Sequence, residues 1–443
     1  MLMLHISDIH FKYGEVGEPD DPNRGLREDL IQDVKYMRGR LGPPGMILLS
    51  GDIAYAGRED EYHFAYYWLQ KELCPAAQCA IENVFVIPGN HDVDLKAEAG
   101  PGFKAARSAL RARPAGEVDA ELREWLRDPS SANIIFSPIE NYNRFFAAKL
   151  LCAIGPYNVI GPDGKTVPNI SKPFVLRDVR LNDGSVLRLW GFNSVLVSDL
   201  TDKVDSMLVD PAAAQITRED GVVHLVMCHH PFGWIKNRGP FEDRMNGVVQ
   251  IQLFGHEHTE RIEENKHFVR IRAGALQPER DAPNWKPGYN WIDVSTAVNQ
   301  GKRKLVVKVW VRMHEVDRFI TVTDRNHNEI WENWLDLPDW EPEKQVEPNQ
   351  SKDDVVDAAP QVLELSMAEP VKPVTVRSVT TKIFRLKEHE QRRLIAKLKL
   401  DETGDRDLKD YEVVVASVRR SAERGQLDTL DSEIDAILAE EGR

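Results

Sequence analysis

Short apolar runs that end abruptly in polar, glycine-containing turns recur along the first 337 residues of the chain. The runs are rich in Val, Ile and Leu. Bounded by turns in this way, they predict strands that are buried on both faces, as in a parallel sheet. The clearest runs lie at 3–6, 46–49, 84–87, 186–190, 222–227 and 249–254.

Amphipathic helical patterns separate the first three of these runs. Apolar residues recur at helical spacing in both gaps. They are Leu26, Leu30, Val34 and Met37, then Tyr62, Ala65, Tyr66, Leu69 and Leu73. This alternation of strand and helix predicts a layered α/β domain that binds ligands at the carboxyl ends of its strands.

The rest of the first 337 residues departs from this rhythm in two places. Residues 95–150 are rich in Ala, Arg and Glu and predict a helical insertion, which either caps the site or only packs against the domain. After residue 268 the pattern becomes β alternation, in which Leu305, Val307 and Val309 share one face. We expect these strands to complete a second sheet of the same domain, which would span residues 1–337.

The C-terminal quarter divides into two kinds of sequence. Residues 338–380 are acidic and Pro-rich without a sustained period, which is typical of a linker. Residues 381–443 carry apolar stripes on charged helical stretches and predict a small all-α module. Partner docking and self-association are both open for this module.

Composition and charge narrow the function classes. The 443 residues are 42% hydrophobic and 29% charged, which excludes wholesale disorder. No apolar run approaches the roughly 20 residues of a membrane-spanning helix, and the start has no signal-peptide pattern, so we expect a soluble, cytoplasmic protein without membrane partners. The net charge of −14 argues against broad affinity for nucleic acid or anionic lipid.

The four cysteines suggest neither a disulfide framework nor a zinc site. Cys74 and Cys79 lie in CPAAQC, which lacks the C-x-x-C spacing of redox and structural zinc motifs. Together with Cys152 and Cys228 they are expected to be reduced and mostly buried.

Potential metal ligands follow five of the predicted strands. They occur in SDIH, SGDIAY, PGNHDV, CHHP and FGHEH. In an extended segment, residues two apart point the same way, so Asp8 with His10, and His256 with His258, can each face one cavity. The preceding Gly51, Gly89 and Gly255 allow tight turns.

The donor set indicates two divalent ions. The candidate ligands are two carboxylates, one amide and four imidazoles, namely Asp8, His10, Asp52, Asn90, His229, His256 and His258. With one carboxylate shared, this number suits two adjacent ions with open positions for water and substrate. Mixed imidazole and carboxylate donors favour Mn²⁺, and also suit Fe, Zn²⁺ or Ni²⁺, rather than Ca²⁺. A dinuclear hydrolase is the natural interpretation.

The ordered blocks DxH, GD, GNHD, H and GHxH resemble those of the calcineurin-like metallophosphoesterase superfamily. The phrases LHISDIHF, GDIAYAGREDEY and VIPGNHDV are most similar to its cyclic-nucleotide phosphodiesterase branch, and the resemblance covers roughly residues 1–300. It implies a four-layer α/β/β/α sandwich.

Block by block, the resemblance also implies roles for individual residues. Asp8, His10, Asp52 and His258 would hold one metal ion, and Asp52 would bridge to the second. Asn90, His229 and His256 would complete the coordination of the second metal ion, with His229 favoured over His230, whose contribution stays open. His91, held by Asp92, would be the catalytic group that assists the leaving oxygen.

The function expected from these observations is hydrolysis of a phosphodiester of small-nucleotide type. Two adjacent ions lower the pKa of a bridging water, so that hydroxide attacks phosphorus near neutral pH. Residues expected near the substrate are Tyr13, Tyr55, Asn193, Phe232, Trp234 and the loop 277–286. The remaining histidines on the strands, His5 and His224, are expected to be core residues.

Two alternatives come from other functional classes. One is a nuclease of the same superfamily, for which Arg107, Arg111 and Arg113 of the insertion could form a local basic stripe. The other is an effector or scaffold that acts through its C-terminal helices on a protein partner.

Overall fold

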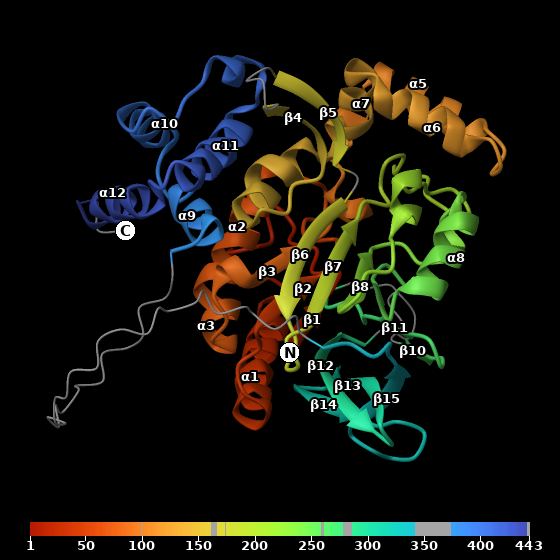
Figure 1. The fold of residues 1–443 in the computed structure, drawn as a ribbon. Coiled ribbons are helices and arrows are strands. Elements are labelled where there is room, and N and C mark those ends of the chain that lie inside the picture. Colours follow the sequence, from red (N-terminus) through yellow and green to blue (C-terminus); the bar gives the residue numbers. More distant parts are fainter. Residues whose placement is uncertain are drawn as a thin grey trace, which may run out of the picture.

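The computed structural model describes residues 1–443 except 99, 161–165, 173, 258–260, 278–285, 342–373 and 441–443. Within the described residues, two mixed β-sheets pack face to face with helices on their outer faces, and a group of helices at the C-terminal end packs beside them (Figure 1). The fold is therefore α/β, with a C-terminal all-α segment, as the sequence predicts.

The first sheet contains the three N-terminal strands at one side. Its order is β14 (Arg318–Val322), β13 (Lys302–Glu315), β12 (Gly288–Asn299), β1 (Leu2–Ile6), β2 (Met46–Leu49) and β3 (Val84–Val86), and β15 (Trp331–Asp336) also pairs with β13. Strands β1, β2 and β3 are parallel, with Met3 opposite Met46 and Ile47 opposite Val84.

Of the described strands after residue 268, only β11 (Val269–Arg272) joins the second sheet as expected. Strand β12 pairs antiparallel with β1, so β12 to β15 extend the first sheet. The alternation in β13 correctly predicts a buried face, because Leu305, Val307 and Val309 are all buried. Alternation encodes burial but not the pairing partner, which is a long-range choice.

The second sheet has the order β10 (Arg261–Glu264), β11 (Val269–Arg272), β9 (Ile251–Phe254), β8 (Val222–Cys228), β7 (Val186–Phe192) and β6 (Phe174–Arg180). Strands β7, β8, β9 and β11 are parallel, and the edge strands β6 and β10 are antiparallel to their neighbours. All six apolar runs that predict strands form strands, and β11 lies in the β region expected after residue 268, whereas β6 and β10 were not predicted.

Strand β8 shows how the layers are stacked. Leu225 and Met227 belong to the main core, which also holds residues of β1 to β3. The alternate residues Val226 and Cys228 belong to a second core together with Met245 of α8 (Arg238–Val248). Successive side chains of a strand point to opposite faces, so the second sheet lies between the first sheet and α8.

Helices close the outer face of the first sheet and complete the four layers. The predicted helices are α1 (Arg24–Leu41) and α2 (Glu59–Trp68), and α2 continues through the π-helical turn η1 (Leu69–Leu73) into α3 (Cys74–Ala77). Leu30, Val34 and Met37 of α1 are fully buried in the main core. Figure 1 shows α1 and α3 on the opposite side of the strands from α8.

The predicted helical insertion is present between β3 and β4. Its helices are α4 (Leu95–Glu98), α5 (Pro101–Ala112), α6 (Val118–Arg127) and α7 (Pro129–Phe136), followed by the short turns η4 (Ser137–Ile139), η5 (Tyr142–Phe146) and η6 (Ala147–Leu150). A hairpin of β4 (Gly155–Ile160) and β5 (Thr166–Lys172), which was not predicted, comes next. Further 3₁₀ turns are η2 (Ile81–Asn83), η3 (Asn90–Asp92), η7 (Pro211–Gln215) and η8 (Phe232–Trp234).

The C-terminal helices form their own core. They are α9 (Val376–Ile383), α10 (Glu388–Lys397), η9 (Thr403–Asp407), α11 (Asp410–Glu423) and α12 (Leu427–Glu440). Helix α9 begins inside the range expected to be linker, because Thr375 and Ser378 form a capping box there. The expected linker lies largely within 342–373, outside the described residues.

The C-terminal helices dock onto the end of the insertion. Arg377 donates to the carbonyl oxygen of Leu150 at 2.6 Å, and Lys409 forms an ion pair with Glu140. All four cysteines are free thiols and buried. Among the described helices, none has the length and apolar composition that crossing a bilayer requires.

Candidate metal centre

The predicted ligands converge at the carboxyl ends of β1, β2, β3, β8 and β9. The loops after β1 and β2 are held together by backbone hydrogen bonds: the amides of Ile9 and His10 donate to the carbonyl oxygen of Asp52 at 2.9 and 3.0 Å. Parallel strands end at the same edge of a sheet, so residues far apart in sequence meet there. The sequence-based placement of the site at this edge is therefore consistent with the structure.

The ligand residues do not use extended backbone as expected. Asp8, His10, Asp52 and His256 have φ angles of 53°, 51°, 53° and 66°, in the left-handed region. Such residues cost about 1–3 kcal/mol each and persist where the surroundings impose them, often at functional sites. The paired ligands thus face the cavity through left-handed turns after the strands rather than through strand periodicity.

The glycines before the ligands are required mainly by close packing. A Cβ atom at Gly51 would lie 2.5 Å from Nδ1 of His229, and one at Gly255 would lie 2.9 Å from the same atom. A Cβ at Gly89 would clash with the backbone and carboxylate of Asp52. Only Gly51 of the three also has a positive φ, of 102°. The expectation of a tight turn therefore holds for Gly51. At Gly89 and Gly255, glycine is required because neighbouring atoms leave no room for a Cβ atom.

Asp52 lies at the centre of the cluster. Its Oδ2 atom is 3.1 Å from Nε2 of His10 and 3.3 Å from Nε2 of His229, and its Oδ1 accepts from the amide of His91 at 2.8 Å. Burial raises the pKa of the Asp52 carboxyl, but the charges of His229 and His91 and the hydrogen bonds from His10 and His229 hold it well below its usual range. Asp52 is therefore a carboxylate.

Asn90 joins the histidines of the second sheet. Its Oδ1 atom lies 3.0 Å from Nε2 of His229 and 3.0 Å from Nδ1 of His256. The amide of His256 in turn lies 3.3 Å from Oδ2 of Asp8. Six of the seven predicted ligands are thus brought together. The seventh, His258, lies outside the described residues.

The donor atoms fit metal ions. Three groups of side chains place one ligand atom each within 4.8 Å of one another. They are Asp8 with Asp52 and His229, His10 with Asp52 and His91, and His229 with His230 and His256. Asp52 and His229 each belong to two of the groups. Buried imidazole and carboxylate donors without thiolate suit Mn, Fe, Zn or Ni.

The rings of His229 and His230 are both oriented by a hydrogen bond at Nδ1. Nδ1 of His229 donates to the carbonyl oxygen of Ser50 at 2.8 Å, which leaves Nε2 as the ligand atom. Nδ1 of His230 lies 2.9 Å from Oγ of Ser194. Burial lowers the pKa of His229, but the Asp52 carboxylate outweighs it and raises that pKa to about 9. Burial lowers the pKa of His230 well below its usual value, so this ring is neutral.

His91 is oriented by a backbone carbonyl rather than by Asp92. Its Nδ1 atom donates to the carbonyl oxygen of Tyr55 at 2.8 Å, which turns Nε2 toward His10, whose ring centre is 4.5 Å away. The expectation that Asp92 holds the His91 ring is therefore wrong. A carbonyl from the neighbouring loop fixes the same tautomer, and the sequence gives no sign of that contact.

Asp92 instead organises the loops around the site. Its buried carboxylate accepts from the amides of Ile53, Ala54 and Gly89 at 2.9 to 3.2 Å and from the hydroxyl of Tyr62 at 3.1 Å. Burial and the charge of Asp52 raise the pKa of Asp92 to about 7, against the amide hydrogen bonds. Asp92 thus positions the loops that carry Asp52, Asn90 and His91.

The residues expected near the substrate are only partly at the site. The Tyr55 ring lies 5.4 Å from that of His91, and Trp234 lies edge-on to His256 at 4.1 Å. Asn193 is buried, and its side-chain oxygen accepts a hydrogen bond from the backbone amide of Val195 in the same loop. Phe232 belongs to the second core.

Two further expectations concern loops around the site. Tyr13 is 56% exposed, under the Arg58 guanidinium. Most of the loop 277–286 lies outside the described residues. At its ends, Gln277 is buried and Lys286 pairs with Glu315.

The remaining histidines on the strands are core residues, as expected. His5 bonds Oγ of Ser50 at 2.9 Å and His224 accepts from the indole of Trp190 at 3.1 Å. Burial lowers the pKa of His5 to about 3 and that of His224 to about 4, so both are neutral.

Sequence reasoning missed Ser194 and Tyr62 as supports of the site. Ser194 follows β7, a parallel strand of the second sheet. No predicted metal ligand follows this strand. The position of Ser194 at a strand end was the available signal. Tyr62 was assigned only to the apolar face of a helix, where its hydroxyl gave no hint of a polar partner.

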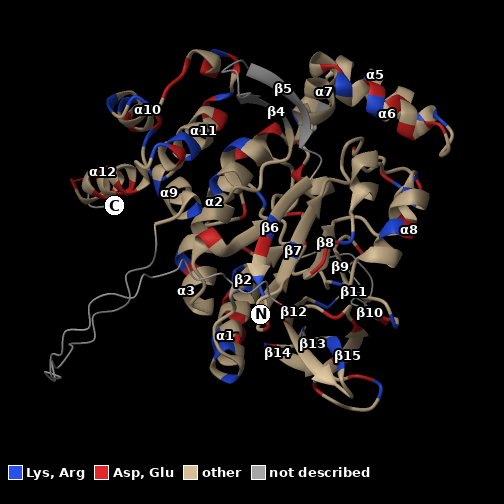
Figure 2. Ribbon diagram, viewed as in Figure 1, with Lys and Arg blue, Asp and Glu red and all other residues tan. Residues whose placement is uncertain are grey.

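The arginines of the insertion do not form a free basic stripe. Arg107 and Arg111 pair with Asp199 at 2.9 and 3.0 Å, and Arg113 pairs with Glu121 at 2.9 Å. Figure 2 shows acidic and basic residues interspersed along α5 and α6. The insertion is thereby tied to the loop after β7, and its charge is matched locally.

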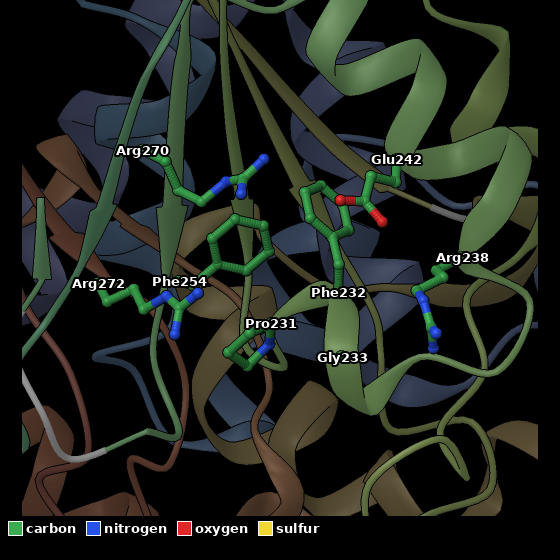
Figure 3. A pocket seen from close by; sticks show the side chains of 8 residues that line it. All are labelled: Pro231, Phe232, Gly233, Arg238, Glu242, Phe254, Arg270 and Arg272. Carbon is green, nitrogen blue, oxygen red and sulfur yellow. The ribbon is translucent and has the colours of Figure 1, made fainter. Parts of the chain in front are cut away.

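A cavity of about 280 Å³ lies on the α8 side of the second sheet. Arg270 and Arg272 lie on one side of its two phenylalanines, Phe232 and Phe254, and Glu242 lies on the other (Figure 3). Both arginines are paired with Glu263, at 2.9 and 3.0 Å. Arg272 also pairs with Glu257, so two neighbouring carboxylates match these two guanidinium charges.

Comparison with known proteins agrees with this architecture. The family model described as calcineurin-like phosphoesterase matches residues 1–260, more than half of the chain. The chain therefore belongs to the calcineurin-like phosphoesterase family.

The relatives found are distant or match only in part. The glycerophosphodiester phosphodiesterase GpdQ of Enterobacter lignolyticus (strain SCF1) is 35% identical over 98 residues, which are 21% of this chain and 30% of that protein. Vacuolar protein sorting 29 from Cryptosporidium parvum is 13% identical with a TM-score of 0.31, over 75% of this chain and 97% of that one. A predicted phosphoesterase from Streptococcus pneumoniae TIGR4 is 11% identical with a TM-score of 0.27, over 75% and 97% of the two chains.

Proposed function

We propose that this protein is a dinuclear metal-dependent phosphodiesterase that hydrolyses a small phosphodiester, of nucleotide or glycerophosphodiester type. The observation that carries the proposal is the position of Asp52. Its carboxylate contacts His10 of the first sheet and His229 of the second, and it belongs to two of the three groups of potential ligands. A shared carboxylate between two sets of donors is the arrangement that a pair of ions requires.

Two sets of side chains would hold the ions. Asp8 and His10, which follow β1 of the first sheet, form one set. Asn90, which follows β3 of the same sheet, forms the other set with His229 and His256, and Asp52 is shared between the two sets. We place His258 with the first set. When bound, the two ions would lower the pKa of water and neutralise charge on the phosphoryl oxygens.

His91 is the catalytic residue of the proposal. Its Nδ1–H is fixed on the Tyr55 carbonyl, so Nε2 faces the cluster and can exchange a proton with the leaving oxygen. Asp92 acts as a positioning residue through the loop amides. The Tyr55 and Trp234 rings border the site and are placed to contact the part of the substrate beyond phosphorus.

A small substrate fits these observations better than a nucleic acid. The net charge is −14, and the insertion arginines are paired with Asp199 and Glu121. The phosphodiesterase named among the relatives supports a diester, although the match spans under a third of that relative. A protein partner acting on the C-terminal helices is compatible with this activity.

The experiment compares bis-p-nitrophenyl phosphate with p-nitrophenyl phosphate as substrates of metal-stripped protein, with and without added Mn²⁺. We expect diester hydrolysis that requires metal. The variant His91→Ala should lose about 10²–10⁴-fold in turnover while it keeps its metal content. Asp52→Asn should lose both metal and turnover.

The matched control is His267→Ala, which removes an exposed imidazole outside the site and should leave turnover unchanged. Protein that binds two metal ions but hydrolyses neither ester would contradict a phosphoesterase. Faster hydrolysis of the monoester would contradict the diester preference.

A further inference from the structure

The buried ring of His230 has an unpaired polar atom at the metal centre. The side chain is fully buried, and its Nε2 atom has no hydrogen-bond partner among the described residues. A buried polar atom without a partner destabilises the folded chain. The ring therefore calls for a partner that is not part of the described chain.

The neighbours of the His230 ring indicate what kind of partner this is. His230, His229 and His256 place their ligand atoms within 4.8 Å of one another. The ring centre of His230 is 4.4 Å from that of His256 and 5.0 Å from that of His229. Three imidazole nitrogens this close together can bind a single ion.

The contact of Nδ1 with Ser194 prepares the ring to bind a metal. The Ser194 hydroxyl lies 2.9 Å from Nδ1 and also accepts from the His230 amide at 3.2 Å. With the proton on Nδ1, the lone pair of Nε2 is free. His229 shows the same arrangement, in which the Ser50 carbonyl takes the place of the hydroxyl. An outer partner on the second ring nitrogen is the usual support of a metal-binding histidine.

We propose that His230 is a third imidazole ligand of the second metal ion, beside His229 and His256. The inference rests on the dinuclear centre of the proposed function and adds a ligand to it. Ser194 is then the positioning residue of this ligand. A third imidazole shifts the preference of this position from Mn²⁺ toward Zn²⁺ or Ni²⁺, since imidazole suits these ions and Mn²⁺ prefers oxygen donors.

The direct test is nuclear magnetic resonance of the full chain with ¹⁵N-labelled histidine, loaded with ¹¹³Cd²⁺. We expect a one-bond cadmium coupling at Nε2 of His230, assigned by its loss in His230→Gln. Coupling at His229 and His256 without coupling at His230 overturns the inference and leaves the proposed function standing. A protein without any cadmium coupling overturns both.

A second measurement compares metal affinities by competition with a chromophoric chelator. Ser194→Ala should weaken Zn²⁺ binding at one of the two sites about 10–100-fold, the usual cost of losing an outer partner, and His230→Gln should weaken it more. Both variants should also lower the preference for Zn²⁺ over Mn²⁺ at that site. The matched control is His224→Gln on β8, the strand that precedes His230. The His224 ring bonds Trp190, so this variant should leave both affinities unchanged.

Equal Zn²⁺ affinities in wild type, Ser194→Ala and His230→Gln would overturn the inference. If His230→Gln fails to fold, the cadmium coupling of the wild-type protein and the affinity of Ser194→Ala still decide it. Unchanged metal affinity together with a raised KM for the diester would assign His230 to the substrate, and that also overturns the inference.

Discussion

Arg312 of β13 and Asp33 of α1 form a buried two-point ion pair. Nε and Nη2 of Arg312 lie 2.8 and 2.6 Å from the two carboxylate oxygens, and the Tyr289 hydroxyl donates to the same carboxylate at 2.5 Å. The pair links the C-terminal part of the first sheet to the helix that follows β1. It thereby helps to fix the strand whose end carries Asp8 and His10.

Removal of one partner should be strongly destabilising. Arg312→Met leaves the Asp33 carboxylate buried without its cation, so we expect a loss of about 3–5 kcal/mol in the free energy of unfolding, measured by urea denaturation. The control Arg40→Met breaks an exposed pair with Glu329 and should cost at most about 1 kcal/mol. Equal effects of the two variants would contradict the importance of burial.

Gly89→Ala should impair the centre without unfolding the protein. The added Cβ meets the carboxylate and backbone of Asp52, so the shared ligand must move. We expect kcat/KM for the diester to fall about 10²-fold, as misplacements near 1 Å do. The control is Gly39→Ala in α1, which should leave activity unchanged. A Cβ atom at this position would have no atom of the described residues within 4 Å. A fully active Gly89→Ala variant would show that the loop adjusts.

Asp92→Asn should destabilise the loops that carry the ligands. The carboxylate accepts hydrogen bonds from three backbone amides and from the Tyr62 hydroxyl. The side-chain NH₂ group of asparagine would place N–H donors opposite these donors. A loss of about 1–3 kcal/mol in the free energy of unfolding is expected, together with weaker metal binding. Asp60→Asn changes an exposed carboxylate and should stay within about 0.5 kcal/mol of wild type.

Removal of metal should lower the thermal stability of the protein. Ions that bind only the folded chain stabilise it by about 2.7 kcal/mol at a concentration 100 times Kd. Differential scanning calorimetry with and without a chelator should show a lower Tm in the chelated sample. The shift should shrink in Asp52→Asn, because the shared ligand is lost. The same Tm in stripped and Zn²⁺-loaded wild-type protein would contradict the proposed metal centre.

The stability of the protein should rise with pH between about 8 and 10 because of Lys149. Burial lowers the pKa of this amine to about 8. Between that value and the ordinary pKa near 10.4 the unfolded chain binds more protons, so the free energy of unfolding increases with pH in this window. Lys149→Met should remove this increase. If the difference in the free energy of unfolding between wild type and variant stays constant from pH 7 to 10, the lowered pKa of Lys149 is refuted.

The sequence by itself determined six strands of the two sheets and the candidate ligands that follow five of them. Apolar runs such as 222–227 specify strands locally, and the turn that follows each run fixes which end bears the polar residues. Because parallel strands end at one edge, the convergence of Asp52, Asn90 and His229 follows from local patterns and chain order.

Only the tertiary structure decided the contacts between segments distant in sequence. Strand β12 joins β1 rather than the second sheet, His91 is held by the Tyr55 carbonyl, and Asp92 collects loop amides. Periodicity records which residues are buried, but the partner of a strand edge or a ring nitrogen depends on how separate segments pack. The unpaired nitrogen of His230 is a result of that packing, and the sequence left its role open for this reason.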